Sequence, residues 1–443
     1  MSGAPTARAR EEARGLDDVR AWLASQQEAM PVITRRIPLR SMTQWSFDRI
    51  GGDLRIAHRS GRFFTVEGLR IRTDFGPVSQ WDQPILVQPE VGTLGIITRV
   101  FNGTRYFLLQ AKVEPGNVNG VQLAPTVQAT RSNYTRVHGG ADTTYLEFFR
   151  AHPRARVLVD QLQSEQASRY LRKQNRNMIV EIQEDLPPDD RFRWLTLRQI
   201  AGLLREPNVV NMDTRTVLAC LPRGSGDGSD RARHPMRELL HWLTDLRACH
   251  SLTLERRSLD ALDRWVIDEA CIQHEGGSYF SVIAVAVDAG CREVRHWEQP
   301  LLEHPGFGLN GFILKRINGR LHFLVRACMY PGNHALFELS STVSRSSADL
   351  YFGRPGAPAY LDLFKDPPAS WIRYSVIQSE EGGRFFHYQN RYVILELPED
   401  VEVPESPVHR FMTLGQVRAL IPHGYFNIEA RNLLACLGDG ALD

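Results

Sequence analysis

The sequence contains none of the short motifs that identify common cofactor-dependent enzymes. There is no HExxH or paired Cys/His spacing for a metal, no GxGxxG opening a helix for a dinucleotide, no Walker loop and no GxSxG nucleophile turn. The 14 histidines are scattered along the chain rather than clustered. We therefore predict that the protein uses no metal, nicotinamide or ATP as a cofactor. If the chain is an enzyme, we expect acid–base chemistry on a bound substrate.

An excess of either charge is also missing, since the chain has 53 basic and 51 acidic residues and a net charge of +2. This balance disfavours a nucleic-acid-binding or anionic-membrane surface, and we expect neither partner. No apolar run is long enough to span a bilayer, and residues 1–14 hold no apolar signal segment. The six cysteines include no CxxC pair, and Cys220 and Cys436 lie in apolar, helix-like segments. We expect buried thiols and a cytoplasmic protein.

What the sequence does contain is one pattern written twice. The repeated blocks are WDQP at 81–84, NG at 102–103, PGN at 115–117 and ACL at 219–221. Each returns 216 residues later, with WEQP in place of WDQP. A constant offset over separated blocks indicates an internal duplication with two similarly folded halves. Polar positions shared by both halves then suggest fold or common binding, whereas those present in one half are candidates for chemistry.

The length of 443 residues suits two domains of about 200 residues each better than one core. We predict a first repeat over 15–222, a linker over 223–235 and a second repeat over 236–438, because the linker is rich in Gly, Ser and charge. Each repeat should open with an amphipathic helix and continue through hairpins, one of which turns at Asn102-Gly103 and at Asn318-Gly319. Each should end in short helices, the first of which is capped by Thr196 or Thr413. The expected fold class is α+β, repeated.

One strand-like segment carries the first candidates for chemistry. Residues 106–114 alternate, so Gln110, Lys112 and Glu114 share one face at a spacing of about 6–7 Å. The equivalent positions of the second copy are Arg326, Cys328 and Tyr330. The Lys–Glu pair therefore occurs once, which favours chemistry, although a solvated sheet face is the alternative.

The next segment, 121–130 (VQLAPTVQAT), alternates in the same way and leads into 131–134 (RSNY). Its uncharged donors and acceptors suit a sugar, and the arginine that follows can bind a phosphate with two hydrogen bonds. The second copy replaces Arg131, Asn133 and Tyr134. An edge strand with polar caps is the alternative explanation.

Other polar blocks are kept in both copies. Residues 163–165 (QSE) and 174–176 (QNR) return at 378–380 and 389–391. The matched positions that follow are Asn211, Asp213 and Arg215 in the first copy and Asn427, Glu429 and Arg431 in the second. Their retention indicates either a polar network that holds the fold or two pockets for the same ligand group.

Four long blocks resemble one known family. They are 110–140, 157–166 (VLVDQLQSEQ), 171–181 (LRKQNRNMIVE) and 211–222 (NMDTRTVLACLP). The blocks resemble the NDP-hexose 2,3-dehydratases, which make deoxysugars for glycosylated natural products. The resemblance implies two tandem Nudix-like α+β domains, with mixed and antiparallel sheets and flanking helices, in a homodimer. Neither half carries the glutamate-rich Nudix box, so metal-dependent hydrolysis is not expected.

The resemblance also implies a substrate, dTDP-4-keto-6-deoxy-glucose, and two nucleotide-sugar pockets per subunit, one of them catalytic. The C4 ketone acidifies the C3 proton, so a base can remove it and an enolate forms. The C2 hydroxyl then leaves with a proton from a general acid, and tautomerisation gives a 3,4-diketo-2,6-dideoxy sugar. A 3-ketoreductase or an aminotransferase is the expected downstream partner.

We assign the catalytic roles to first-copy residues that the second copy replaces. Glu114 is the preferred general base, Lys112 stabilises the enolate or tunes Glu114, and Tyr134 is the candidate acid. Because Glu114 precedes Pro115-Gly116, a turn-supporting carboxylate is a rival role. The expected substrate contacts are Trp45, Gln110, Gln122, Thr126, Gln128, Thr130, Arg131, Ser132, Asn133, Ser164, Arg172, Asn175 and Arg176. The expected second pocket, weakened or vestigial, comprises Trp297, Arg326, Arg345, Arg384, Gln389, Asn390, Arg391, Asn427 and Arg431.

Two other functions fit the same residues. An epimerase or keto-isomerase on this scaffold would remove the same proton without losing water. A non-catalytic nucleotide-sugar binding protein would use both halves as sensors. It would have no obvious reason to keep Lys112 and Glu114 in one half alone.

Overall fold

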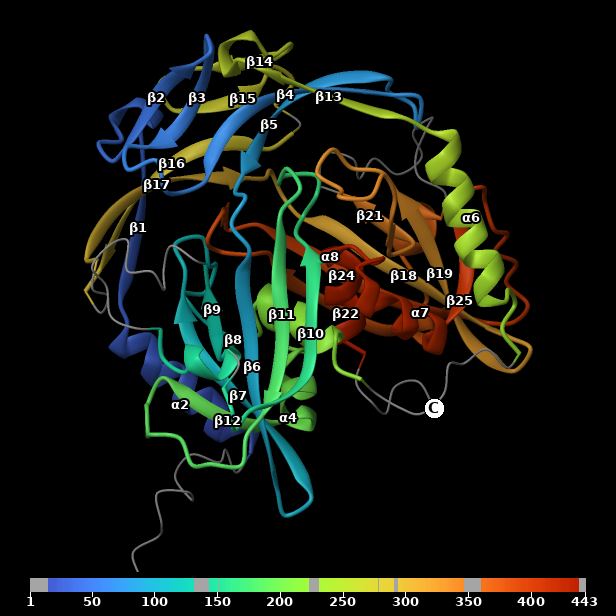
Figure 1. Ribbon diagram of the computed structural model, residues 1–443. Helices are drawn as coiled ribbons and strands as arrows, with labels where there is room; N and C mark the ends of the chain where they lie inside the picture. Colours follow the sequence, from blue (N-terminus) through green and yellow to red (C-terminus); the bar gives the residue numbers. More distant parts are fainter. Residues whose placement is uncertain are drawn as a thin grey trace, which may run out of the picture.

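The computed structural model describes residues 15–130, 143–150, 152–222, 231–277, 279–290, 294–345 and 360–437. The expected ligands Arg131, Ser132 and Asn133 and the candidate acid Tyr134 lie outside these ranges, so their roles remain predictions. The described residues form an α+β fold of mixed and antiparallel sheets with few helices, as predicted (Figure 1).

Each half contributes one large sheet with the same strand order. The first-half strands are β6 (Gly92–Phe101), β7 (Thr104–Val113), β8 (Val121–Pro125), β9 (Val127–Ala129), β10 (Arg156–Ser164), β11 (Gln174–Glu181) and β12 (Phe192–Thr196). Their counterparts are β18 (Gly308–Ile317), β19 (Arg320–Cys328), β20 (Glu338–Ser340), β21 (Val343–Arg345), β22 (Ile372–Ser379), β24 (Gln389–Leu397) and β25 (His409–Thr413). The central strand β6 pairs in parallel with β11 and antiparallel with β7, and β18 repeats this with β24 and β19.

The hairpins predicted at the two Asn-Gly turns are confirmed. Asn102 and Gly103 have φ of 47° and 76°, and Asn318 and Gly319 have φ of 53° and 72°. Positive φ at both central residues is the turn geometry that matches the twist of paired strands, and Asn-Gly adopts it most readily. The turns fix the register of β6 with β7 and of β18 with β19.

Two smaller sheets lie together at the top of the molecule in Figure 1. One contains β2 (Trp45–Ile50), β3 (Asp53–His58), β4 (Thr65–Thr73), β5 (Gln80–Val87) and β13 (Leu252–Arg257). The other contains β1 (Val32–Ile37), β14 (Trp265–Ile267), β15 (Cys271–His274), β16 (Ser281–Ala289), β17 (His296–Glu303) and β23 (Phe385–Phe386). Strand β13 of the second half pairs with β4 of the first, and β1 of the first pairs with β16 of the second. The halves thus exchange a strand and are not independent modules in space.

The described helices open each repeat and return near its end, as predicted. The α-helices are α2 (Leu16–Ala29), α4 (Leu197–Leu203), α5 (Met212–Ala219), α6 (Met236–Cys249), α7 (Leu414–Leu420) and α8 (Ile428–Ala435). Short 3-10 turns cover Leu39–Ser41, Leu146–Phe149, Leu259–Ala261, Leu361–Phe364, Ala369–Trp371 and Ile421–His423. Thr196 and Thr413 form the predicted caps as complete capping boxes, which satisfy backbone N–H groups at the starts of α4 and α7. None of the described helices is long and apolar enough to cross a membrane.

The two halves share one hydrophobic core, in which Leu109 and Leu123 pack in the same cluster as Phe323 and Leu433. At its centre α5 packs against α8. Two fully buried arginines cross this contact. Arg215 donates to Gln378 Oε1 at 3.0 Å and to the carbonyl of Ser379. Its counterpart Arg431 donates to the carbonyl of Ser164 at 2.6 Å and to Thr216 Oγ1 at 2.9 Å. These retained arginines therefore hold the halves together.

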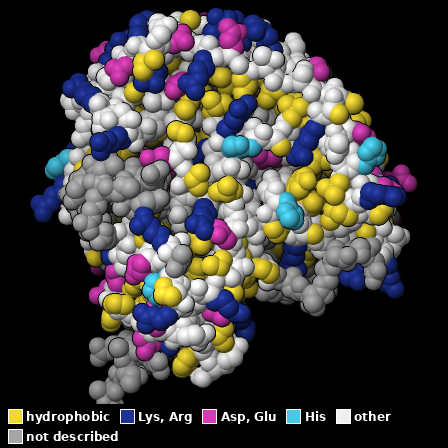
Figure 2. All heavy atoms as spheres, in the orientation of Figure 1, with side chains coloured by type: hydrophobic (Ala, Val, Ile, Leu, Met, Phe, Trp, Pro, Cys, Tyr) yellow, Lys and Arg dark blue, Asp and Glu magenta, His cyan; other side chains and the backbone are white. Residues whose placement is uncertain are grey.

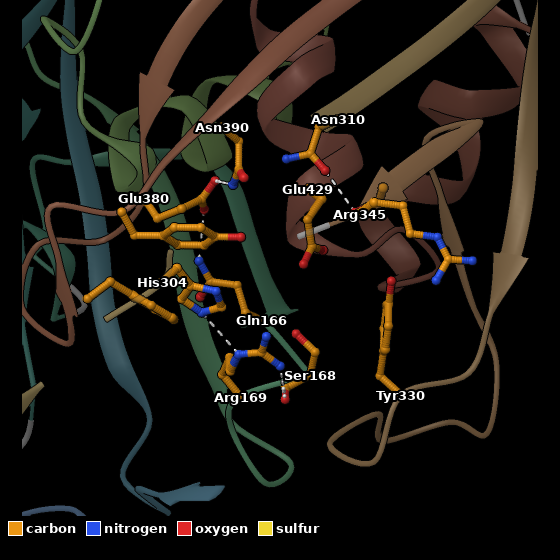
Figure 3. Close-up of a pocket in the computed structure, with 13 residues that line it drawn as sticks. Gln166, Ser168, Arg169, His304, Asn310, Tyr330, Arg345, Glu380, Asn390 and Glu429 are labelled. Carbon is orange, nitrogen blue, oxygen red and sulfur yellow. Dashed lines mark hydrogen bonds between the residues drawn. The ribbon is translucent and has the colours of Figure 1, made fainter. Parts of the chain in front are cut away.

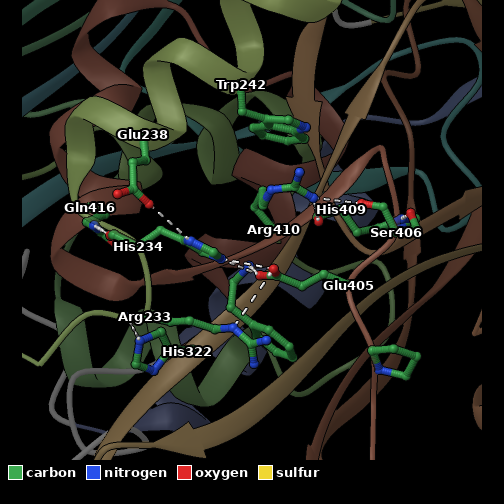
Figure 4. A network of polar contacts seen from close by, with 12 residues as sticks. Arg233, His234, Glu238, Trp242, His322, Glu405, Ser406, His409, Arg410 and Gln416 are labelled. Carbon is green, nitrogen blue, oxygen red and sulfur yellow. Dashed lines mark hydrogen bonds and ion pairs between the residues drawn. The ribbon is translucent and has the colours of Figure 1, made fainter.

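A second polar network fastens the chain where it enters the second half (Figure 4). His234 Nε2 lies 2.9 Å from Glu405 Oε1, and Gln416 Nε2 donates to the carbonyl of His234 at 2.7 Å. Glu405 also accepts the backbone N–H of Phe411 at 2.6 Å. On the outer surface, Lys and Arg side chains are interspersed with acidic and hydrophobic ones over the face in Figure 2, as the balanced composition suggests.

Candidate active site

One cavity of about 1090 Å³ collects residues from both halves. Its walls come from the end of β7, from β9, from the sheet β2–β5 and from the second-half segments 297–299 and 381–384. Small-molecule sites usually enclose about 300–1,000 Å³. The cavity is therefore large enough for an extended ligand with several chemical groups.

Lys112 and Glu114 lie at this cavity and face each other. Lys112 Nζ is 3.4 Å from Glu114 Oε1, and the two side chains are 20% and 10% exposed. Gln128 Nε2 donates to the same oxygen at 3.0 Å, and Asn211 Nδ2 donates to Gln128 Oε1 at 3.3 Å. The alternation of β7 brings Lys112 and Glu114 to one face of the sheet. Because both side chains are largely buried, that face is not a solvated sheet face.

The contacts of Glu114 also bear on its rival role in the turn. The turn is closed by the backbone, because the N–H of Asn117 donates to the carbonyl of Glu114 at 3.1 Å. The carboxylate of Glu114 instead contacts Lys112 and Gln128. The side chain is therefore directed at the cavity rather than at the turn.

Three more carboxyl groups line the same end of the cavity: Glu165, Asp213 and Glu381. Burial raises the pKa of Glu165, and burial together with the charges of Glu165, Glu381 and Glu114 raises the pKa of Asp213 well above its ordinary value. Burial, then the charge of Glu114, raises the pKa of Glu381 to about 7. Burial also lowers the pKa of Lys173 to about 8. This cluster can hold and release protons near neutral pH.

Another part of the cavity wall is aromatic and basic. Trp45, Phe63 and Phe64 line it, together with Trp297 of the second half. Trp45 Nε1 donates to the carbonyl of Glu298 at 2.7 Å, which fixes the ring. The guanidinium of Arg384 lies 4.1 Å from the centre of the Phe64 ring. Flat rings and a fixed cation suit an aromatic base and an anionic group.

The repeated Pro-Gly-Asn blocks explain how the second half reaches this cavity. The N–H of Gly116 donates to the carbonyl of Gly382 at 2.7 Å, and the N–H of His387 donates to the carbonyl of Gly116 at 2.9 Å. A Cβ on Gly116 would lie 1.8 Å from the carbonyl oxygen of Phe385, so the backbones meet too closely for a side chain. Gly332 receives the first-half loop in the same way, with Tyr170 O at 1.7 Å from its Cβ position.

The predicted substrate contacts divide into two groups. Trp45, Gln128, Thr130 and Asn175 line the large cavity with Lys112 and Glu114. Outside its lining lie Gln110, Gln122, Thr126, Ser164, Arg172 and Arg176. The side chains of β8 face the contact between the halves, where Gln122 donates to Ser379 Oγ at 3.0 Å. Thr126 Oγ1 accepts the N–H of Ile97 at 2.9 Å, and exposed Arg176 pairs with Asp160 at 2.6 Å.

The second half has a cavity at the equivalent place, with a volume of about 130 Å³ (Figure 3). Arg345 and Asn390 line it, as the sequence suggested for an accessory pocket. Trp297 and Arg384 were assigned to the wrong pocket, because both line the large cavity. The sequence comparison assumed that each half builds its own pocket, whereas the halves exchange loops.

The remaining residues expected in the second pocket lie outside its lining. Asn427 caps α8, and Arg431 crosses between the halves. Arg391 donates to Ser375 Oγ at 3.3 Å, and Arg326 lies half-buried beside Tyr330, with Nη2 3.5 Å from the hydroxyl. Gln389 begins β24 and pairs with Ser379.

Bulky residues account for the small volume of the second cavity. Tyr330 occupies the position of Glu114, Tyr388 that of Lys173 and His304 that of Gln88. The His304 and Tyr388 rings stack with centres 3.9 Å apart. Arg345 replaces Ala129. These side chains fill space that is open in the first half.

Several members of the acid–base cluster were not predicted as site residues. Glu165 and Asp213 were noted only as positions that both copies keep. Tyr170, Lys173 and Glu381 line the large cavity and were not among the predicted site residues. Among the described residues no group of three or more His, Cys, Asp and Glu side chains is arranged to hold a metal ion.

Comparisons with known proteins identify the family. A sequence model described as NDP-hexose 2,3-dehydratase matches residues 16–221 and again 236–437. A protein of Amycolatopsis orientalis named dTDP-4-dehydro-6-deoxy-alpha-D-glucopyranose 2,3-dehydratase is 44% identical over 433 residues, which cover 96% of this chain and 90% of the relative. Proteins of the same name from Saccharopolyspora spinosa and Streptomyces violaceoruber are 44% and 42% identical, over 94% of this chain and 90% and 96% of theirs. The resemblance seen in the sequence is confirmed, and the chain belongs to the NDP-hexose 2,3-dehydratase family.

Proposed function

We propose that the chain is a dTDP-4-keto-6-deoxy-glucose 2,3-dehydratase. It removes the C3 proton of the keto sugar and eliminates the C2 hydroxyl, which gives a 3,4-diketo-2,6-dideoxy sugar nucleotide. The observation that carries this proposal is the large cavity, whose lining combines aromatic and basic side chains with a cluster of carboxyl and ammonium groups. Relatives named for the same reaction support it.

Different parts of the cavity wall would bind different parts of the substrate. The rings of Trp45 and Phe64 offer flat surfaces to the thymine base. Arg384 lies over the Phe64 ring and its charge acts on Glu381. It suits the diphosphate because a guanidinium can bind it with paired hydrogen bonds. The hexose then lies among Lys112, Glu114 and Glu381.

In this arrangement Glu114 accepts the C3 proton. The ammonium of Lys112, 3.4 Å from the Glu114 carboxylate, supplies positive charge for the enolate that forms. A base of this kind contributes roughly 10²–10⁴-fold to the rate. Departure of the C2 hydroxyl requires a general acid as well, and Tyr134 remains the candidate from the sequence.

The remaining expectations belong to the same proposal. Each half would have a Nudix-like fold, and the active form would be a homodimer in the cytoplasm that works without a cofactor. Because a 3,4-diketo sugar is reactive, a 3-ketoreductase or an aminotransferase would consume the product. The sparse cysteines, of which Cys220 and Cys436 are buried free thiols, agree with a reducing compartment.

The test is incubation with the 4-keto sugar nucleotide and a trapping ketoreductase, followed by mass spectrometry. The expected product has lost one water from the hexose. A product of unchanged mass would instead indicate an epimerase or keto-isomerase. Tight binding without any product would indicate a nucleotide-sugar binding protein.

A further inference from the structure

Because the halves exchange loops, each cavity is lined by residues of both halves. The equivalent positions of the two cavities can therefore be compared directly. The loop after β22 brings Glu381 to the large cavity, and the loop after β10 brings Gln166 to the small one. Likewise Tyr170 lines the large cavity and its counterpart Phe385 lines the small one. An acid and a phenol therefore occur in the cavity that also contains Lys112 and Glu114. At the same two positions the other cavity has the amide of Gln166 and the phenyl ring of Phe385.

We propose that Glu381, a residue of the second half, is the general acid that protonates the departing C2 hydroxyl, and that Tyr170 is its positioning residue. This inference rests on the proposed dehydratase function and deepens it. It replaces Tyr134 as the acid, and it makes the active site a joint product of both halves.

The geometry places Glu381 near the proposed base. A Cβ built on Gly383 would lie 2.2 Å from Glu381 Oε1 and 3.5 Å from Glu114 Oε1, so these two oxygens lie close together beside this glycine. Tyr170 donates its hydroxyl proton to Glu381 Oε2 at 2.9 Å. One oxygen of Glu381 is thus held by Tyr170, and the other lies on the side of the carboxyl group that is close to Glu114.

The other carboxyl groups of the cluster fit a structural role better. Glu165 and Asp213 are matched in the second cavity by Glu380 and Glu429, so they are not specific to the large cavity. Glu165 accepts a hydrogen bond from Asn175 at 2.6 Å, and Glu380 is held in the same way by Asn390 and by Gln166 (Figure 3). A carboxyl group kept in both cavities supports the fold that they share.

The surroundings of Glu381 keep part of it protonated at neutral pH. Burial and the charges of Glu114 and Glu165 oppose ionisation, whereas the nearby cations of Arg384 and Lys173 and the hydroxyl of Tyr170 favour it. The balance raises the pKa of Glu381 to about 7. Acid catalysis is most efficient when the pKa of the acid lies near the working pH.

The proposed step balances without an added reagent. Glu114 takes the C3 proton, and the electron pair of that C–H bond forms the enolate. The enolate pair then forms the C2–C3 double bond as the C2–O bond breaks, and the leaving oxygen takes the Glu381 proton and departs as water. Glu114 ends protonated and Glu381 ionised, so exchange with solvent restores both groups.

The experiment separates the two proton transfers with Glu381→Gln in the full-length protein. The variant copies the natural Gln166 of the second cavity, so a folded protein is expected. In D₂O we expect deuterium to enter C3 of the substrate, while the rate of water loss falls by roughly 10²–10⁴-fold and TDP affinity stays unchanged. The control Tyr330→Phe, in the small cavity, should eliminate water at the rate of the unmodified protein.

A second variant, Tyr170→Phe, copies the natural Phe385. Loss of the hydroxyl that stabilises ionised Glu381 should raise its pKa further, so the alkaline limb of the pH–rate profile should move to higher pH. A purely structural role of Tyr170 would lower the rate at all pH values without moving this limb, and that result would refute the positioning role.

Two results would overturn the role of Glu381. One is water loss by Glu381→Gln at the unmodified rate, and the other is loss of both C3 exchange and elimination. Failure of the proposed function is distinguishable, because then the unmodified protein itself would not release water from the keto sugar.

Discussion

Replacing Glu114 with glutamine should abolish turnover while leaving substrate binding intact. Glutamine has the shape of glutamate, and its amide oxygen can still accept the hydrogen bond that Gln128 donates at 3.0 Å. It cannot accept the C3 proton. Losing a general base costs roughly 10²–10⁴-fold in rate, which corresponds to about 2.7–5.5 kcal/mol of transition-state stabilisation.

The assay for Glu114→Gln combines single-turnover kinetics, C3 deuterium exchange and calorimetric titration with TDP. Both exchange and elimination should disappear, in contrast to Glu381→Gln, because the first proton transfer is blocked. Glu114→Asp keeps the carboxylate but withdraws it by one carbon, and a misplacement of about 1 Å can cost roughly 10²-fold. Unchanged turnover in Glu114→Gln would remove Glu114 from the mechanism and with it the reasoning from the duplicated halves.

Three further outcomes follow from the cavities and their supports. Calorimetry should find one TDP site per chain, because about 130 Å³ in the second cavity is below the usual range of ligand sites, and two equal sites would contradict this. Gly116→Ala should lower the melting temperature and turnover, because the new Cβ would lie 1.8 Å from Phe385 O. Such overpacking costs about 1–3 kcal/mol of folding free energy. Gly15→Ala is the matched control, because a Cβ there would have nothing within 4 Å. Glu381 and Glu429 both have a pKa raised to about 7, so the folded protein binds their protons more tightly than the unfolded chain does. The stability gained in this way is complete at a pH below the unfolded pKa and is lost as the pH rises through about 7. Melting curves should show that Glu429→Gln reduces this loss, and an unchanged pH dependence would refute the assignment.

Local rules explain why part of the site was predictable. Alternation along a strand is fixed by the backbone, so the sequence alone shows that Lys112 and Glu114 share a face. The turn at Asn102-Gly103 and the cap at Thr196 depend on neighbours within a few residues, and both were predicted. The family followed from long blocks of sequence, and the comparisons confirm it.

The location of Gln122 and Thr126 shows where local rules stop. Both lie on the polar face predicted for residues 121–130, yet Gln122 donates across the halves to Ser379 and Thr126 accepts the N–H of Ile97 in its own sheet. The alternation of polar and apolar residues along a strand predicts which side chains share a face. It does not predict which other element packs on that face. Only the packing of α5 and α8 against the sheets decides this.

The sequence by itself determined the duplication, the α+β class, the hairpins and the family. Only the tertiary structure decided that each cavity is built from both halves, which places Trp297 and Arg384 at the first cavity and brings Glu381 near Glu114. The physical reason is that strand periodicity and turn geometry are properties of adjacent residues. The exchange of strands and loops depends instead on how hydrophobic surfaces more than about 170 residues apart in the chain are buried together.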